Sequence, residues 1–237
     1  MRSCLIQLVI AVALIFALLW FGLPFAASWL ATNALNAAGF TGTSTKVEVS
    51  ADLPPRILLG HADRVRLTST KVSVGDLHAA TIDMTLGNVE LIDRKIGTIH
   101  GTMTGVLVPT AIGSTPLNVD TATVDGAGAA ATTTLTCSNA ELKTLILAQL
   151  KSQRITATAV TFAAPNKVTA TVGGKPVVGH LYVTDGALQV VIAAPKPVAL
   201  TLIGAGNGNP IHLKSVAVGA TTVTLLGTMD LQSLLGL

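Results

Sequence analysis

The chain has few charged residues and few aromatics, and each shortage excludes a class of protein. Charged side chains make up 11% of the 237 residues and aromatic side chains 3%. Disordered chains combine low hydrophobicity with high net charge, whereas this chain is 50% hydrophobic with a net charge of +3. It is therefore expected to fold. Without a dense Lys/Arg cluster, or aromatics to stack on bases, nucleic acid is not an expected partner.

Cysteine is almost absent as well. Cys4 lies in the N-terminal apolar run, and Cys137 stands alone in the rest of the chain. No intramolecular disulfide and no cysteine-based metal site are therefore expected beyond that run.

Motifs that carry catalysis are also missing. No H-E-x-x-H and no G-x-S-x-G pattern occurs, and no nucleophile has a base beside it in the sequence. The histidines are scattered along the chain: His61, His78, His100, His180 and His212. We therefore predict a protein that is not an enzyme and has no metal or cofactor.

The most informative segment that is present runs from Cys4 to Ala31. It holds no charged residue and one amide, Gln7. A helix rises about 1.5 Å per residue, so a run of this length can cross a hydrocarbon core of roughly 30 Å. Arg2 precedes the run and the next charge is Lys46. This asymmetry favours an N-terminus inside the cell and export of everything that follows.

Two interpretations of this run stay open. A signal peptide has an apolar core of about 7–15 residues, and this longer run favours an uncleaved anchor. Ala26-Ala27-Ser28, just after Pro24, fits a cleavage site. We expect residues 1–32 to be a signal-anchor or signal peptide and residues 33–237 an exported domain. The protein is then expected to cross the cell membrane once, with this domain on the outside. If the signal is cleaved, the domain is secreted.

The sequence pattern of the exported part predicts mainly short strands. Val65 and Leu67 share one face, whereas Val72 and Val74 share the opposite parity, which predicts a bulge or a bend. Asp185-Gly186 is a strong hairpin signal. The expected strands cover Lys46–Ser50, His61–Val74, Leu77–Leu86, Lys95–His100, Met103–Val108, two weak strands in Val119–Thr136, Ile155–Phe162, Lys167–Val172, Val177–Thr184, Leu188–Ala193, Val198–Ile203, His212–Val218 and Thr221–Thr228.

Helices are fewer. Ser138 with Glu141 forms a capping box, and apolar residues then repeat at helical spacing up to Leu150. The pattern of Ser28–Gly39 continues the N-terminal helix, and Leu231–Leu235 reads as a short terminal helix. This order of strands, helix, strands and helix suggests two similar halves.

These elements predict an α+β fold, with a curved antiparallel sheet wrapped on one or two helices. The apolar strand faces exceed what one clear helix can cover, so a ligand with an apolar body is a candidate to cover the rest. A groove for an acyl chain and a closed core are both compatible with the composition.

Leu53–Val74 contains an apolar, Pro-containing turn, with Pro54 and Gly60, followed by a D-R-V-x-L strand starting at Asp63. This pattern resembles the LmeA-like phospholipid-binding family. Leu77–Leu86 is similar to its next strand. The D-R-V-x-L strand also contributes Arg64, Val65 and Leu67. The remaining matches are Glu141-Leu142 at the helix start, and Pro210–Val218, Leu226–Leu231 and Leu234–Gly236 in the closing hairpin and tail.

This resemblance implies a tubular lipid-binding (BPI-like) domain that binds phospholipid or a related acyl lipid and has no catalytic residues. Such a protein would hold or transfer lipid at the outer face of the cytoplasmic membrane, in the periplasm or cell envelope. The predicted groove residues are Val65, Leu67, Ile82, Met84, Leu86, Leu142, Leu145 and Ile146. The alternatives are a structural or interaction module of the envelope with a closed core and, more weakly, an enzyme of lipid or glycan metabolism. No protein partner is identified.

Overall fold

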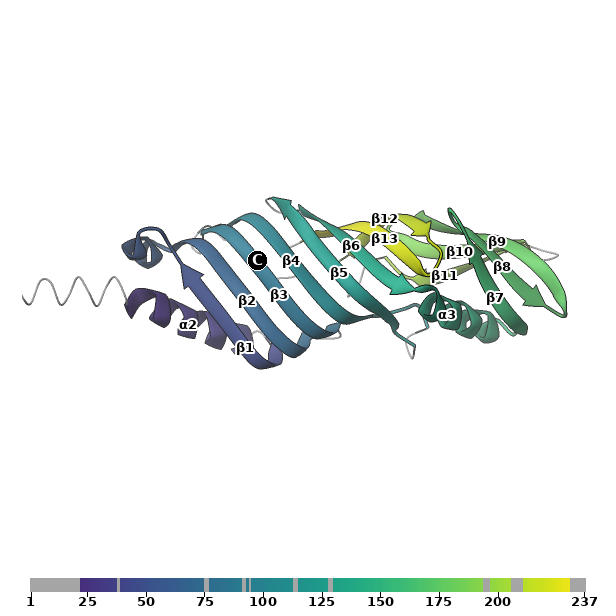
Figure 1. Ribbon diagram of the computed structural model, residues 1–237, viewed down its shortest axis with the longest axis horizontal. Helices are drawn as coiled ribbons and strands as arrows, with labels where there is room; N and C mark the ends of the chain where they lie inside the picture. Colours follow the sequence, from purple (N-terminus) through teal and green to yellow (C-terminus); the bar gives the residue numbers. More distant parts are fainter. Residues whose placement is uncertain are drawn as a thin grey trace, which may run out of the picture.

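The computed structural model describes residues 22–37, 39–74, 77–90, 93, 95–112, 115–127, 130–193, 197–205 and 211–230. Two predicted features lie outside these residues: the part of the apolar run up to residue 21 and the terminal helix predicted for Leu231–Leu235. The described chain forms an elongated molecule of two antiparallel sheets and two α-helices (Figure 1). The α+β expectation is therefore confirmed in its general form.

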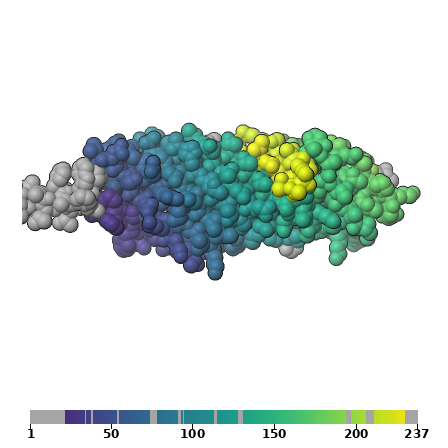
Figure 2. Space-filling view, viewed as in Figure 1, coloured from purple at the N-terminus to yellow at the C-terminus, as the bar shows by residue number. Residues whose placement is uncertain are grey.

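The larger sheet has eight strands, and its spatial order differs from the chain order at one edge. That order is β1 (Thr41–Ser50), β2 (His61–Val74), β3 (Leu77–Glu90), β4 (Lys95–Val108), β5 (Leu117–Ala127), β6 (Ala130–Ser138), β13 (Thr222–Asp230) and β12 (Ile211–Val218). The C-terminal hairpin thus returns to pair with β6, and Figure 2 shows it in yellow on the surface.

The second sheet has five strands in simple hairpin order. These are β7 (Ala157–Ala163), β8 (Lys167–Val172), β9 (Lys175–Thr184), β10 (Ala187–Ala193) and β11 (Pro197–Ile203). The β9–β10 turn has positive φ at both Asp185 and Gly186, which is the geometry that the sequence pair predicted. Sheets of eight and five strands do not form two similar halves.

The change of parity in β2 is a bend that crosses several strands. Lys71 has φ of 50° between the inward-facing positions Ser69 and Val72. In β4, Gly105 has φ of 56°, and a Cβ built there would lie 2.9 Å from the Cβ of Ala80 in β3. At these neighbouring positions of β2, β3 and β4, the side chains that faced one side of the sheet continue on the other side. This confirms the bend that the sequence predicted.

Helix α3 (Asn139–Ser152) joins the two sheets. It begins as predicted, because Ser138 Oγ accepts a hydrogen bond from the Glu141 N–H at 3.2 Å. The helix packs mainly on β7 and β11, and also on β5, β6 and β13. Its apolar stripe is fully buried, at 0–1% exposure: Leu142, Leu145, Ile146 and Leu150.

Helix α2 (Leu23–Ala37) lies against β1 and the 3-10 helix η2 (Pro54–Leu59) (Figure 1). It ends before Gly39, whose φ of 84° makes it the stop that the sequence predicted. The expected boundary after residue 32 falls inside this helix. None of the helices in the described ranges combines the length and the apolar character needed to cross a membrane.

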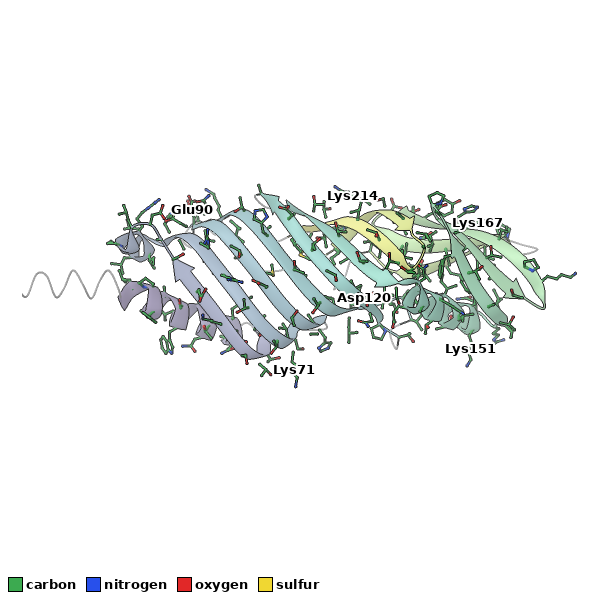
Figure 3. The ribbon with its side chains drawn as sticks, viewed as in Figure 1. Lys71, Glu90, Asp120, Lys151, Lys167 and Lys214 are labelled. Carbon is green, nitrogen blue, oxygen red and sulfur yellow. The ribbon has the colours of Figure 1, made fainter. Side chains whose placement is uncertain are left out.

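The segments Lys95–His100 and Met103–Val108, predicted as separate strands, form one strand, β4. Gly101 and Thr102 between them pair with β3 and β5 and keep the ladder continuous. Charges stay away from the core, since the only buried polar side chains among the described residues are Ser69 and Thr133. In Figure 3, Lys71 and Lys151 lie along one long edge, with Lys167 and Lys214 along the other.

Candidate functional site

The candidate site is the inner face of the eight-stranded sheet, the side whose residues join the hydrophobic core. Five predicted groove residues lie here, on β2 and β3. Leu67 pairs with Met84, Val65 pairs with Leu86, and Ile82 follows along β3. Ile82 is buried, whereas the other four are only partly buried. The structure therefore brings these five residues together as the sequence predicted.

The outer face of the same strands is polar. Arg66 forms a bidentate pair with Asp83, with Nε–Oδ1 at 3.1 Å and Nη2–Oδ2 at 2.9 Å. This hydrogen-bonded pair lowers the pKa of Asp83 and raises that of Arg66. Both side chains are about half exposed, so the pair marks the solvent side of the sheet.

The other three predicted residues, Leu142, Leu145 and Ile146, belong to the same hydrophobic cluster as Ile82 but occupy another part of it. They belong to α3, and β2 and β3 are not among the main neighbours of that helix. The physical reason is the strand order. The helix follows directly from β6, which is three strands from β3, or about 14 Å at the usual strand spacing.

Helix α2 lies against β1 and η2, and it packs on a cluster at the β1 end of the inner face. Ala27, Ala31 and Leu35 pack with a cluster whose buried members are Val47, Val49, Ala62 and Val89. Val65, Leu67 and Leu86 pack against the same cluster. The Val49 N–H also donates to Ser28 Oγ at 3.1 Å. The short α2 leaves the leucines on β2 and β3 incompletely covered.

Small residues continue the inner face beyond β3. The paired positions from β1 to β13 form what we call the central row: Val47, Leu67, Met84, Gly101, Val124, Thr133 and Gly227. Two of its members after Met84 are glycines, and the other two, Val124 and Thr133, are smaller than leucine. Met84 reaches over the first of them, since a Cβ on Gly101 would lie 2.7 Å from Met84 Cγ.

Thr133 is the one polar side chain of the central row. It is 0% exposed, and its Oγ1 has no hydrogen-bond partner in the structure as described. A buried polar group without a partner costs about 1–3 kcal/mol. Sequence reasoning did not single out Thr133, although the scarcity of bulky apolar residues in Asn118–Thr136 was a signal.

Asp63, part of the D-R-V pattern, fixes a loop. Its Oδ2 accepts the Asp52 N–H at 2.6 Å, and its Oδ1 lies 3.0 Å from His61 Nε2 and 3.7 Å from Arg56. The Asp52 hydrogen bond is the main cause of the lowered pKa of Asp63. These contacts hold η2 against β2, beside a pocket of ≈ 260 Å³ lined by Leu59, Gly60, His61, Glu90 and Asp93.

Chemistry at the remaining reactive groups is limited. Burial raises the pKa of the Cys137 thiol to about 12, so this thiol is protonated and a poor nucleophile at neutral pH. Within the described residues, no group of three or more His, Cys, Asp or Glu side chains could hold a metal ion.

Comparisons with protein-family models, with curated proteins and with solved structures found no match. The function is therefore argued from the site itself.

Proposed function

We propose that this protein binds phospholipid or a related acyl lipid on the inner face of its larger sheet. It holds or passes that lipid at the outer face of the cytoplasmic membrane. The observation that carries the proposal is the incomplete cover over Leu67, Met84 and Leu86. These residues face the core, yet the chain leaves them partly exposed.

The central row supports an elongated ligand. From β3 to β13 it crosses four strand spacings, about 19 Å at the usual separation, a scale suited to an acyl chain. Burial of each CH₂ group contributes about 0.8 kcal/mol. The Thr133 hydroxyl on this path has no hydrogen-bond partner but is 0% exposed, so a ligand would reach it only by displacing neighbouring side chains.

The fold and the N-terminal sequence support the same proposal. A large antiparallel sheet that packs with helices suits a tubular lipid-binding (BPI-like) domain of the LmeA-like type. The uncharged run from Cys4 would place the domain at the membrane. Apolar binding needs no catalytic residue, so we propose a carrier or holder of lipid and not an enzyme.

The test is lipid binding by a Met84→Trp variant of the full chain. The indole would fill space beside Gly101, so bound fluorescent phospholipid should fall several-fold while the melting temperature stays near that of the wild type. Val177→Trp is a matched control, because Val177 is also partly buried but lies on β9. It should leave binding unchanged. Mass spectrometry of organic extracts of the purified wild type would identify the lipid.

A second candidate function is a structural or interaction module with a closed core. The complete burial of the α3 stripe and of Val119, Ala122 and Leu135 favours it. In that case Met84→Trp would overpack the core and lower stability by about 1–3 kcal/mol. Binding would not change, and the wild type would carry no lipid.

A further inference from the structure

Exposed apolar side chains gather at one end of the molecule. Among the described residues, nine large hydrophobic side chains are exposed, and six lie on α2 or on the loop with η2. We call these six the apolar end surface: Phe25, Trp29, Leu30, Leu53, Leu58 and Leu59. Their exposure ranges from 54% to 80%. The other three, Val178, Tyr182 and Leu226, lie on β9 and β13.

Helix α2 is apolar on two sides. Ala27 and Ala31, four residues apart, pack on the sheet cluster. Each residue turns the helix by about 100°, so Phe25 and Trp29 project from the opposite side. No residue of α2 is charged. The outward side is polar toward the C-terminal end, where Asn33 and Asn36 are exposed, so its exposed apolar side chains lie in the first half of the helix.

The η2 loop presents its leucines from a fixed position. Leu58 and Leu59 precede Gly60, whose φ of 76° ends the 3-10 helix. Asp63 holds the other end of the loop through the Asp52 N–H. Ile57 packs on the same cluster as α2. The two halves of the apolar end surface are therefore parts of one packed unit (Figure 1).

We propose that the apolar end surface docks onto a lipid bilayer, with these side chains in the interfacial layer. The sequence just before α2, from Cys4 to Gly22, is apolar and uncharged, which ties this end of the chain to a hydrocarbon phase. With 15 residues, α2 is about 22 Å long, which is shorter than the hydrocarbon core of a bilayer, roughly 30 Å thick.

The composition of the apolar end surface is typical of residues at a membrane–water interface. Tryptophan prefers the boundary between headgroups and acyl chains. Arg56 on η2 lies 3.7 Å from Asp63, and its side chain is still 45% exposed, so its remaining donors can contact a phosphate of an anionic headgroup. Docking would orient the domain on the membrane. It does not require the inner face of the sheet to bind lipid.

The experiment uses the full chain in vesicles of phosphatidylcholine and phosphatidylglycerol. Cys4→Ser removes the N-terminal thiol, and Cys137 stays unlabelled because it is buried. An environment-sensitive fluorophore is then attached through Leu58→Cys. The matched control is Lys175→Cys, an exposed position at the start of β9 in the other sheet. Spin-labelled lipids should quench the first fluorophore several-fold more than the second.

Equal and weak quenching at both positions would overturn the proposal. Efficient disulfide cross-linking between two Leu58→Cys chains would also overturn it, because the occupant would then be a second copy. Leu59→Asp in the Leu58→Cys background should reduce quenching several-fold, with circular dichroism confirming the fold. Phospholipid binding measured through Met84→Trp is independent, so failure of one proposal leaves the other intact.

Discussion

The two ends of this molecule bury their apolar residues to different extents. Around α3, the helix stripe and the facing strands are sealed, and Val168, Leu181, Leu188 and Leu202 are 0% exposed. Around α2, Leu67, Met84 and Leu86 keep partial exposure, while Phe25 and Trp29 point outward. Both ends are rich in apolar residues, so the difference lies in what covers them.

The reason is the position of each helix. Helix α3 lies between two sheets, and strands from both contact it. Helix α2 lies against the edge strand of one sheet and the short η2. We infer that the sealed end holds the fold together, whereas the uncovered end is where lipid would supply the missing contacts.

The largest expected effect compares matched leucines from the two ends. Leu145→Ala removes a fully buried side chain and should cost about 2–5 kcal/mol of unfolding free energy. Leu86→Ala removes a partly exposed one and should cost clearly less. Denaturant unfolding of both variants measures the difference. Equal losses would mean that the α2 end is as closed as the α3 end.

A smaller effect concerns the bend in the sheet. Gly105→Ala adds a Cβ 2.9 Å from that of Ala80 at a positive φ, which should cost about 1–2 kcal/mol. The double variant with Ala80→Gly removes the contact but keeps the φ, so it should recover part of the loss. No effect of Gly105→Ala on the melting temperature would contradict the bend.

Replacement of one serine in each region compares how much a single hydrogen bond stabilises α3 and α2. Ser138→Ala removes the cap of α3 and should cost about 1 kcal/mol. Ser28→Ala removes the acceptor of the Val49 N–H, a hydrogen bond with a net contribution of about 0.5–1.5 kcal/mol. Faster hydrogen exchange of the Val49 amide in the second variant alone would show that this serine fastens α2 to β1.

The smallest effect is a pH dependence of the η2 loop. The pKa of Asp63 lies below its ordinary value of 3.8. This carboxylate therefore contributes stability that is present above pH 3.8 and is lost as the pH falls through the lowered value. An NMR titration of the loop amides should show release in that acidic range. Asp63→Asn should abolish the transition. An unchanged titration in this variant would show that the Asp63 carboxylate does not hold the loop.

Several features could be read from local sequence. Ser138 with Glu141 predicted the start of α3, and Asp185-Gly186 predicted a hairpin, because caps and tight turns depend on neighbouring residues alone. The shift in parity between Leu67 and Val72 predicted the bend. The co-location of five of the predicted site residues on β2 and β3 followed from the period-2 pattern of two successive strands.

The tertiary structure decided the features that depend on residues far apart in the chain. Helix α3 does not lie over β2 and β3, because strand order places β6 and its helix three strands away from β3. Thr133 lies in the middle of the sheet because β13 pairs with β6 across about 90 residues of sequence. Sequence determined which segments become strands and helices through local periodicity. Which apolar faces stay uncovered was decided by long-range pairing, which local patterns do not encode.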